Sequence, residues 1–222
     1  NYTGLVLTQL ISILKGSPVT NTMLEVATSS NLWVNLFIMV LCAPVAEELI
    51  FRKLLIDRLA QYGEGVAVLF SGLMFGLFHG NLNQFVYAFV LGLCFGFIYV
   101  KTGNIRYTIG LHMLVNFLGS VLGVAILKWL GDDFLSVASD PAGMMSYMTG
   151  NFGKLIVYFI YIFLLLGVAI AGIILFIVNL KKIRFQPGMN TIPKGKRFST
   201  TVLNVGMALY MIVWIVIIIV QL

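Results

Sequence analysis

Residues 43–55 read APVAEELIFRKLL, which places two adjacent glutamates, Glu47 and Glu48, directly after an apolar run. The chain around them is strongly apolar, because 60% of its 222 residues are hydrophobic and 10% are charged. Soluble domains carry about 25% charged and about 45–50% apolar residues, and a soluble fold of this length could not cover so many apolar side chains. The sequence therefore predicts an all-α, polytopic transmembrane helix bundle.

Apolar segments that could cross a bilayer follow one another along the chain. A crossing takes about 20 residues at a rise of 1.5 Å per residue. Six candidates meet this requirement approximately: residues 32–54, 66–82, 84–100, 105–127, 154–180 and 202–221. Residues 4–14 form a shorter apolar run, and because the chain opens on Asn1, we expect this run to be the tail of a longer helix. The sequence thus predicts about six to seven membrane segments.

The basic residues predict the orientation of these segments. If residues 32–54 run from outside to inside, eleven of the fourteen basic residues lie in cytoplasmic loops, as the positive-inside rule requires. The eleven are Arg52, Lys53, Arg58, Lys101, Arg106, Lys181, Lys182, Arg184, Lys194, Lys196 and Arg197. Orientation therefore explains the net charge of +6, and we expect the lipid bilayer, not nucleic acid, as the partner of these residues.

Small residues and cysteines within the apolar segments predict packing. Glycine and alanine recur at four-residue spacing, which lets membrane helices approach closely. The predicted seams are Gly72, Gly76 and Gly80; Gly92 and Gly96; Gly119 and Gly123; and Gly167 and Ala171. Cys42 and Cys94 lie inside apolar runs and are expected to be packing residues, not a disulfide.

Ionisable side chains interrupt three of the segments. Glu47 and Glu48 lie in the first, His79 in the second and His112 in the fourth, and the chain has no other histidine. A charged side chain near the centre of a membrane helix costs about 2.5–3.5 kcal/mol on insertion scales. Residues kept at that cost are candidates for function.

Spacing predicts that these groups share one depth. Glu47 and His79 are equally distant in sequence from Gly63, so two helices that form an antiparallel hairpin there place both at a similar depth. Counted from the end of the first segment, Glu47 lies about 10 Å below the surface. Counted from a turn at Gly103, His112 lies about 13 Å below. Three ionisable groups on three helices are thus within reach of cytoplasmic water.

Spacing within each helix indicates which side chains pair. Arg52 follows Glu48 by four residues, the favourable order for an ion pair on a helix, so Arg52 neutralises Glu48 and leaves Glu47 free. This pair has two interpretations, a purely structural one and a role in support of catalysis. A histidine in a helix bundle can likewise serve only as an interhelical hydrogen-bond partner.

Each histidine has a companion on its own helix face. Phe75 precedes His79 by four residues, and Asn116 follows His112 by four. Asn116 adds an amide donor beside an imidazole. A free carboxylate, two imidazoles and an amide suffice to activate water and to stabilise an oxyanion.

Three motifs on successive membrane helices carry a family resemblance: Glu47-Glu48-x-x-x-Arg52, Phe75-x-x-x-His79 and His112-x-x-x-Asn116. In this order they resemble the CPBP family of intramembrane glutamic endopeptidases, which comprises CAAX proteases and bacteriocin-processing enzymes and is also called the Abi family. Residues 91–116, LGLCFGFIYVKTGNIRYTIGLHMLVN, are similar to the family's approach to its second histidine. The resemblance covers residues 47–116 and implies a catalytic core of four helices.

The resemblance implies a role for every motif residue. Glu47 and His79 would activate a water molecule for attack on a peptide carbonyl, while His112 and Asn116 would form the oxyanion hole. The remaining motif residues would support these groups: Glu48, Arg52 and Phe75. No cofactor is needed for such a reaction.

Zinc is the alternative to direct glutamate catalysis. Glu47, His79 and His112 are also a suitable zinc ligand set. The family resemblance favours glutamate catalysis, and the zinc alternative stays open.

The apolar segments, together with the resemblance over residues 47–116, predict an organisation of the chain in three parts. Residues 1–31 would form a partial N-terminal membrane segment and an outer loop, and residues 32–127 the CPBP-like catalytic core. Residues 128–222 would form an outer loop and two C-terminal transmembrane helices, with the stretch 128–153 either a plain connection or partly re-entrant.

The expected substrate is a peptide or a membrane-associated protein, lipid-modified if it is of the CAAX type. A prenylated CAAX tail, a bacteriocin leader or a secreted pheromone peptide would fit, and so would a role in bacteriocin self-immunity. In a bacterium, this multi-pass protein would lie in the cytoplasmic membrane with its site open to the cytoplasm. The alternative from another class is a non-enzymatic membrane module, such as an immunity scaffold or a proton-coupled transporter whose buried groups relay protons.

Overall fold

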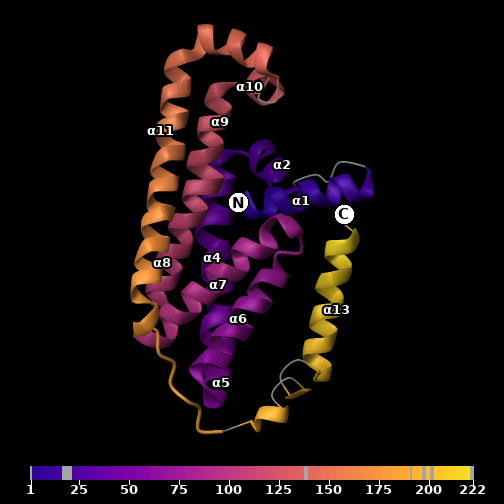
Figure 1. Cartoon of the computed structure of the whole chain (residues 1–222), viewed down its shortest axis with the longest axis vertical. Coiled ribbons are helices and arrows are strands. Elements are labelled where there is room, and N and C mark those ends of the chain that lie inside the picture. The colour runs from indigo at the N-terminus through magenta and orange to yellow at the C-terminus, as the bar shows by residue number, and fades with distance from the viewer. Residues whose placement is uncertain are drawn as a thin grey trace. The chain divides into compact units, whose positions relative to one another are not determined.

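The computed structural model describes residues 2–16, 22–137, 140–190, 192–196, 199–200 and 203–220, and helices dominate them (Figure 1). In chain order the α-helices are α1 (Tyr2–Lys15), α2 (Thr22–Ser29), α3 (Leu32–Val34), α4 (Ala43–Glu48), α5 (Asp57–Leu59), α6 (Glu64–Phe78), α7 (Leu82–Thr102), α8 (Ile105–Asn116), α9 (Val124–Leu130), α10 (Asp132–Val137), α11 (Pro141–Asn179) and α13 (Val205–Val220). Three further segments are π-helical: η1 (Asn35–Cys42), η2 (Leu49–Ile56) and η4 (Phe117–Gly123). Three short segments are 3₁₀-helical: η3 (Ala60–Tyr62), η5 (Leu180–Lys182) and η6 (Lys194–Lys196).

Several of these segments join into continuous helices that could cross a membrane. Four of them are long and apolar enough: Leu32–Tyr62, Leu82–Thr102, Ile105–Leu130 and Pro141–Lys182. Two shorter apolar helices, α6 and α13, occupy the two other stretches in which the sequence predicts membrane segments. The prediction of an all-α polytopic membrane protein is confirmed.

The first long helix extends further than the sequence predicts. A cytoplasmic loop was expected to begin after residue 54, yet the helix continues to Tyr62. Polar contacts one turn apart prolong it, because Lys53 forms an ion pair with Asp57 at 2.8 Å and the Arg58 guanidinium donates to the Leu54 carbonyl. The polar composition of this stretch therefore marks an exposed helix end, not a loop. Residues 128–153 are also helical over most of their described length.

Two glycines close the turns that the sequence predicts. Gly63, at φ 114°, ends the first long helix and precedes α6, and Gly103, at φ 64°, ends α7. Such positive φ values favour glycine because it lacks a Cβ atom. The predicted hairpin at Gly63 and the predicted turn at Gly103 are both present.

The helix that carries the two glutamates departs from regular α geometry on both sides of them. The segments η1 and η2 are π-helical, and the short α4 lies between them. Pro44, in the first turn of α4, has no N–H to donate to the carbonyl four residues earlier. A π-helical turn bonds residues five apart, so it can pass over such a proline, and turns of this kind are frequent at functional sites.

The described chain divides into two compact units. The first comprises Asn1–Glu25, Leu41–Met113 and Phe185–Leu222. Within it, α6 packs directly on α7: a Cβ atom on Gly92 would lie 2.8 Å from the Cα of Gly72. The backbones thus approach as closely as glycine allows, and this predicted seam is confirmed.

The second unit comprises Val26–Val40 and Leu114–Arg184. Its buried core joins Leu130, Phe134 and Leu155, which belong to α9, α10 and α11. The division into units concerns packing and does not test the expected three-part organisation of the chain.

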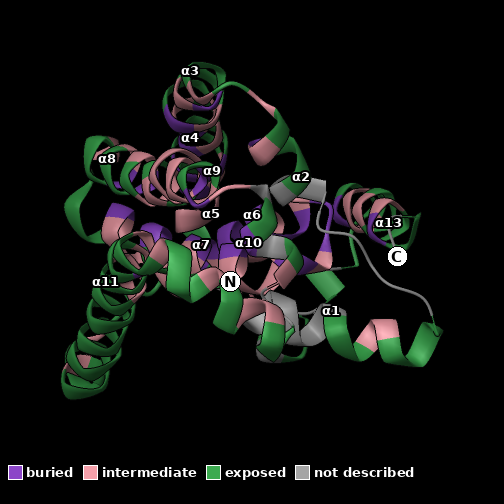
Figure 2. Cartoon of the chain, turned by 90° about the horizontal axis from the view of Figure 1, so that it is seen from above, coloured by how far each residue is buried: buried purple, intermediate pink, exposed green. Residues whose placement is uncertain are grey.

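Most of α11 is exposed along its length, as the green ribbon in Figure 2 shows. Only Leu155 of its side chains is buried, although α11 is among the most apolar helices of the chain. An apolar helix with so little buried surface is suited to lipid as its surroundings.

Candidate active site

Glu48 and Arg52 form the buried ion pair that their spacing predicts. Arg52 Nε lies 3.0 Å from Glu48 Oε2, and a terminal guanidinium N–H donates to Oε1 at 3.1 Å. Both side chains are fully buried. A charge without water needs such a partner, since an uncompensated buried charge is strongly destabilising.

Ser71 of α6 extends this pair, and the sequence analysis did not identify it. Arg52 donates to the Ser71 hydroxyl at 2.8 Å, and that hydroxyl donates to the Phe51 carbonyl at 2.8 Å. A signal was present in the sequence, because Ser71 precedes Phe75 by four residues and His79 by eight, on one helix face.

His112 of α8 contacts both glutamates. Its Nδ1 lies 3.1 Å from Glu48 Oε1, and its Nε2 lies 3.7 Å from Glu47 Oε2. Spacing pairs Glu48 with Arg52 alone, and the family resemblance implies an oxyanion role for His112. The structure brings His112 to the carboxylates as well, from a helix 64 residues further along the chain.

Glu47 is the more accessible of the two glutamates. Its side chain is 17% exposed, whereas that of Glu48 is fully buried. Its Oε2 atom has no hydrogen-bond partner among the described residues. Spacing leaves Glu47 without a partner, whereas the structure brings His112 Nε2 to 3.7 Å from its Oε2.

His79 ends α6 with one ring nitrogen already engaged. Its Nδ1 lies 2.8 Å from the Phe75 carbonyl. Because a carbonyl only accepts, Nδ1 carries the proton, and in the neutral ring Nε2 is left as an acceptor. Asn81 fixes the residue from the other side, because its amide donates to the His79 carbonyl at 2.9 Å.

Phe75 lies at the centre of this group. Its ring centroid is 4.8 Å from that of His79 and 5.6 Å from that of His112, both in edge-on geometry. The Arg52 guanidinium carbon lies 4.7 Å from the same centroid. Two imidazoles and a guanidinium thus surround one buried ring, and the supporting role of Phe75 in catalysis stays a prediction.

The C-terminal helix α13 contacts the end of α6 that carries His79. The Tyr210 hydroxyl donates to the Met74 carbonyl at 2.7 Å, and the rings of Trp214 and Phe78 lie 5.1 Å apart. A Cβ atom on Gly80, which has φ 66°, would meet Trp214 and Ile217 within 3.3 Å. No motif of the sequence indicated these contacts.

Asn116 lies at the end of α8, one turn beyond His112. Its amide donates to the Met39 carbonyl at 2.7 Å, a contact within the second unit. An amide carries two N–H donors, so one remains for another acceptor. The oxyanion role of Asn116 stays a prediction.

In the part of the chain that the structure describes, no group of three or more His, Cys, Asp or Glu side chains is arranged to hold a metal ion. Glu47, His79 and His112, the ligand set of the zinc alternative, therefore form no such group. That alternative stays a prediction for experiment.

Comparisons with known proteins agree with the motif pattern. Residues 29–118 match the model of a family described as type II CAAX prenyl endopeptidase Rce1-like. This span contains every motif residue, and the resemblance to the CAAX-protease family is confirmed. The chain thus carries an Rce1-like segment.

Two curated relatives are also described as a membrane protease or peptidase. The chain is 26% identical over 152 residues to the membrane-embedded CAAX protease MroQ of Staphylococcus aureus (strain USA300), an alignment that covers 65% of this chain and 59% of that protein. It is 32% identical over 74 residues to YdiL of Bacillus subtilis (strain 168), described as a candidate membrane peptidase, over 33% of this chain and 30% of that protein. The chain thus spans less than two thirds of either relative. No solved structure matches it.

Proposed function

We propose that this protein is an intramembrane peptidase in which Glu47 activates water for the hydrolysis of a peptide bond. The difference between two adjacent glutamates carries the proposal. Glu48 is fully buried and engaged by Arg52 and His112, whereas the Glu47 side chain is 17% exposed and its contact with His112 is longer, at 3.7 Å. The first is suited to structure and the second to proton transfer.

His79 supplies a second acceptor for the attacking water. With Nδ1–H donated to the Phe75 carbonyl, its Nε2 accepts a hydrogen bond from the water and orients it, while Glu47 removes the water's other proton. The water oxygen then attacks the peptide carbonyl carbon, and a carbon–oxygen bond forms. When the carbon–nitrogen bond breaks, the proton taken from water passes to the leaving amine.

His112 and Asn116 would stabilise the oxyanion. His112 Nδ1 lies 3.1 Å from Glu48 Oε1, so Nε2 is the ring atom left to face a developing negative charge. The position of Asn116, four residues further along the same helix, supports its role as second donor.

The substrate proposed is a peptide or a membrane-associated protein that enters from the cytoplasmic side. The name of the relative MroQ, a CAAX protease, supports a peptide with a lipid-modified tail as one candidate. Bacteriocin leaders and pheromone peptides are the others. The same reaction would serve peptide processing or bacteriocin self-immunity.

The test is hydrolysis by purified protein in liposomes. Prenylated CAAX peptides, their unmodified counterparts and leader peptides are incubated with the protein, and the products are identified by mass spectrometry. Glu47→Gln and His79→Gln should each lower the rate by about 10²–10⁴, the usual contribution of a general base. Asp133→Asn, an exposed acid of the second unit, is the matched control and should keep full activity. Undiminished cleavage by Glu47→Gln would overturn the mechanism.

A further inference from the structure

A chain of hydrogen bonds leads from His79 onto α7, the helix that carries none of the three sequence motifs. Asn81 caps this helix, because its side-chain oxygen accepts the Gln84 N–H at 2.8 Å. The Asn81 amide nitrogen donates to the His79 carbonyl at 2.9 Å and to Gln84 Oε1 at 2.8 Å. Gln84 Nε2 in turn donates to the Tyr87 hydroxyl at 3.2 Å. The chain thus ends on a phenol.

The direction of each bond in this chain is determined. An amide oxygen only accepts and an amide nitrogen only donates. Because Asn81 Oδ1 accepts a backbone N–H, its nitrogen faces Gln84 Oε1, and Gln84 Nε2 therefore faces Tyr87. The Tyr87 oxygen is the acceptor in the last bond, so its own hydrogen is left over. No acceptor among the described residues takes that hydrogen.

Tyr87 lies beside the groups that are proposed to act on water. Its ring centroid is 6.4 Å from that of His79, at an interplanar angle of 66°, and its side chain is partly exposed. The charge of Glu47 acts on the Tyr87 hydroxyl. The carboxylate and the free ring nitrogen of His79 are both acceptors, suited to the protons of water. Tyr87 adds what these two groups lack, an unused hydrogen-bond donor.

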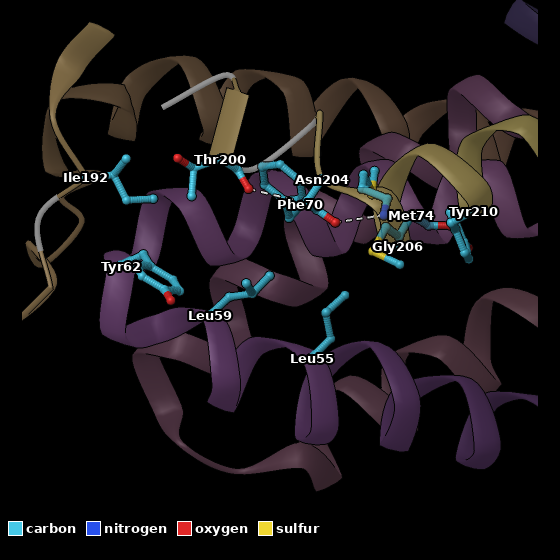
Figure 3. A pocket seen from close by; sticks show the side chains of 11 residues that line it. Leu55, Leu59, Tyr62, Phe70, Met74, Ile192, Thr200, Asn204, Gly206 and Tyr210 are labelled. Carbon is cyan, nitrogen blue, oxygen red and sulfur yellow. Dashed lines mark hydrogen bonds between the residues drawn. The ribbon is translucent and has the colours of Figure 1, made fainter. Parts of the chain in front are cut away.

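The apolar cavity of the first unit does not supply such a donor to the site (Figure 3). Its volume is about 320 Å³, and Phe70 and Met74 are the residues of α6 that line it. Phe75 follows Met74 by one residue and so lies about 100° further around the helix, on the face that carries His79. The cavity and the catalytic candidates thus occupy different faces of α6.

We propose that Tyr87 binds the substrate by donating its hydroxyl hydrogen to a peptide carbonyl oxygen. A carbonyl that enters the membrane loses its hydrogen bonds to water, so a donor of the protein must replace them. Gln84 keeps the Tyr87 hydroxyl available as that donor, and Asn81 keeps Gln84 in the required orientation. The inference rests on the proposed function for the nature of the ligand, a peptide, and adds a contact that none of the sequence motifs contains.

The first measurement is peptide binding without turnover. The full-length Glu47→Gln variant in detergent is titrated with a fluorophore-labelled farnesylated CAAX peptide and with an unmodified leader peptide, and fluorescence anisotropy gives the Kd. Tyr87→Phe, which keeps the ring and removes the hydroxyl, should raise the Kd about two- to tenfold in this background. Tyr161→Phe is the matched control, since its hydroxyl donates to the Leu118 carbonyl in the second unit, and it should leave the Kd unchanged.

The second measurement identifies the carbonyl. Each peptide of a series carries sulfur in place of one carbonyl oxygen, and sulfur is the weaker acceptor. At one position this replacement should itself weaken binding to the Glu47→Gln parent, and Tyr87→Phe should then cause no further loss, because the two changes remove the same contact. A purely structural role of Tyr87 would instead give the same loss for every peptide of the series.

Cleavage by the wild-type background separates this inference from the proposed function. If the wild type cleaves a peptide and Tyr87→Phe binds and cleaves it equally well, the peptidase stands and the role of Tyr87 is overturned. If the wild type binds without cleavage and the loss disappears at one thioamide, the contact stands and the peptidase fails. An unchanged Kd in Tyr87→Phe, an equal loss along the whole series, or no binding of either peptide would overturn the contact.

Discussion

Arg52 contacts more partners than its spacing in the sequence indicates. The i,i+4 pattern predicts its pair with Glu48, and the structure adds Ser71 and the ring of Phe75. Through Glu48, the guanidinium is also linked to His112. A single buried cation thus orients groups on η2, α4, α6 and α8.

The stability of this buried group is the first prediction. Arg52→Met should lower the free energy of unfolding by about 3–5 kcal/mol, because it leaves Glu48 charged and uncompensated. The double variant Arg52→Met with Glu48→Gln should recover much of this loss, since no charge is then left without a partner. Thermal unfolding in detergent measures both. Equal destabilisation by the single and double variants would contradict the role of charge.

Metal dependence is the second prediction. In the proposed mechanism, Glu47 and His79 act on water directly, so 1,10-phenanthroline should leave the cleavage rate unchanged. The control is a known zinc peptidase in the same liposomes, which the chelator should inactivate. If the chelator abolishes cleavage and added zinc restores it, the zinc alternative is the correct one.

The sequence predicted the contact within one helix of this buried group better than the contacts between helices. Local spacing identified Glu48 and Arg52, because partners one turn apart are set by the helix itself. The contact between His112 and Glu48 joins residues 64 positions apart, so it depends on helix packing that no local pattern encodes. Ser71 was missed because serine in an apolar helix is unremarkable until the position of its partner is known.

At the scale of elements, the glycine pattern predicted some helix contacts correctly and others wrongly. Gly72 and Gly92 form the close approach of α6 and α7. A Cβ atom on Gly123 would lie 3.0 Å from the Tyr161 hydroxyl, whereas on Gly119 or Gly167 it would meet nothing within 4 Å. Small residues at four-residue spacing show that another helix could pack closely on that face, but they do not show which helix does so.

A short connection ties the C-terminal part of the chain to the hairpin within the first unit. Gly63 and Pro187 form an isolated β-type bridge, and the Gln61 carbonyl accepts the N–H of Asn190 at 2.9 Å. A Cβ atom on Gly188 would lie 2.2 Å from the Gln61 carbonyl oxygen. The segment 185–190 therefore fits against the turn only because residue 188 has no side chain.

Gly188 supplies the third prediction. Gly188→Ala should displace the segment 185–190 from the turn, because the added methyl group collides with backbone atoms that cannot rotate away. Hydrogen exchange at Glu64 and Asn190, whose N–H groups bond across this contact to Gln186 and Gln61, should speed up, and the thermal midpoint should fall. Gly195→Ala, where a Cβ atom meets nothing within 4 Å, is the control and should match the wild type. Unchanged exchange in Gly188→Ala would contradict the tight fit.

At the scale of the whole molecule, composition predicted the most. The excess of apolar residues predicted an integral membrane protein, and the spacing of apolar runs located all of the long helices approximately. Helix ends were predicted less well, because the polar residues after residue 54 are compatible with both a loop and an exposed helix end. Contacts one turn apart accompany the extension to Tyr62: an ion pair between Lys53 and Asp57, and a hydrogen bond from the Arg58 side chain to the Leu54 carbonyl.

The orientation of the chain is the fourth prediction. The basic residues place residue 196 on the cytoplasmic side and residue 133 on the opposite side. In a background with Cys42 and Cys94 replaced by alanine, a membrane-impermeant maleimide should label Asp133→Cys in intact cells. It should label Lys196→Cys only after the cytoplasmic face is opened. The reverse labelling would contradict the orientation and the cytoplasmic entry of substrate.

The placement of both histidines in one group makes the site readable by spectroscopy. The chain has two histidines, and both contact Phe75. A sample labelled with ¹⁵N only at histidine would therefore give ring-nitrogen resonances from the site and from nowhere else in the chain. Nitrogen chemical shifts distinguish protonated from unprotonated ring positions, so the Nδ1–H form of His79 and the charge of His112 could be followed directly as a peptide binds. Histidine labelling alone would therefore report on the site, and no probe would have to be attached to the surface of the protein.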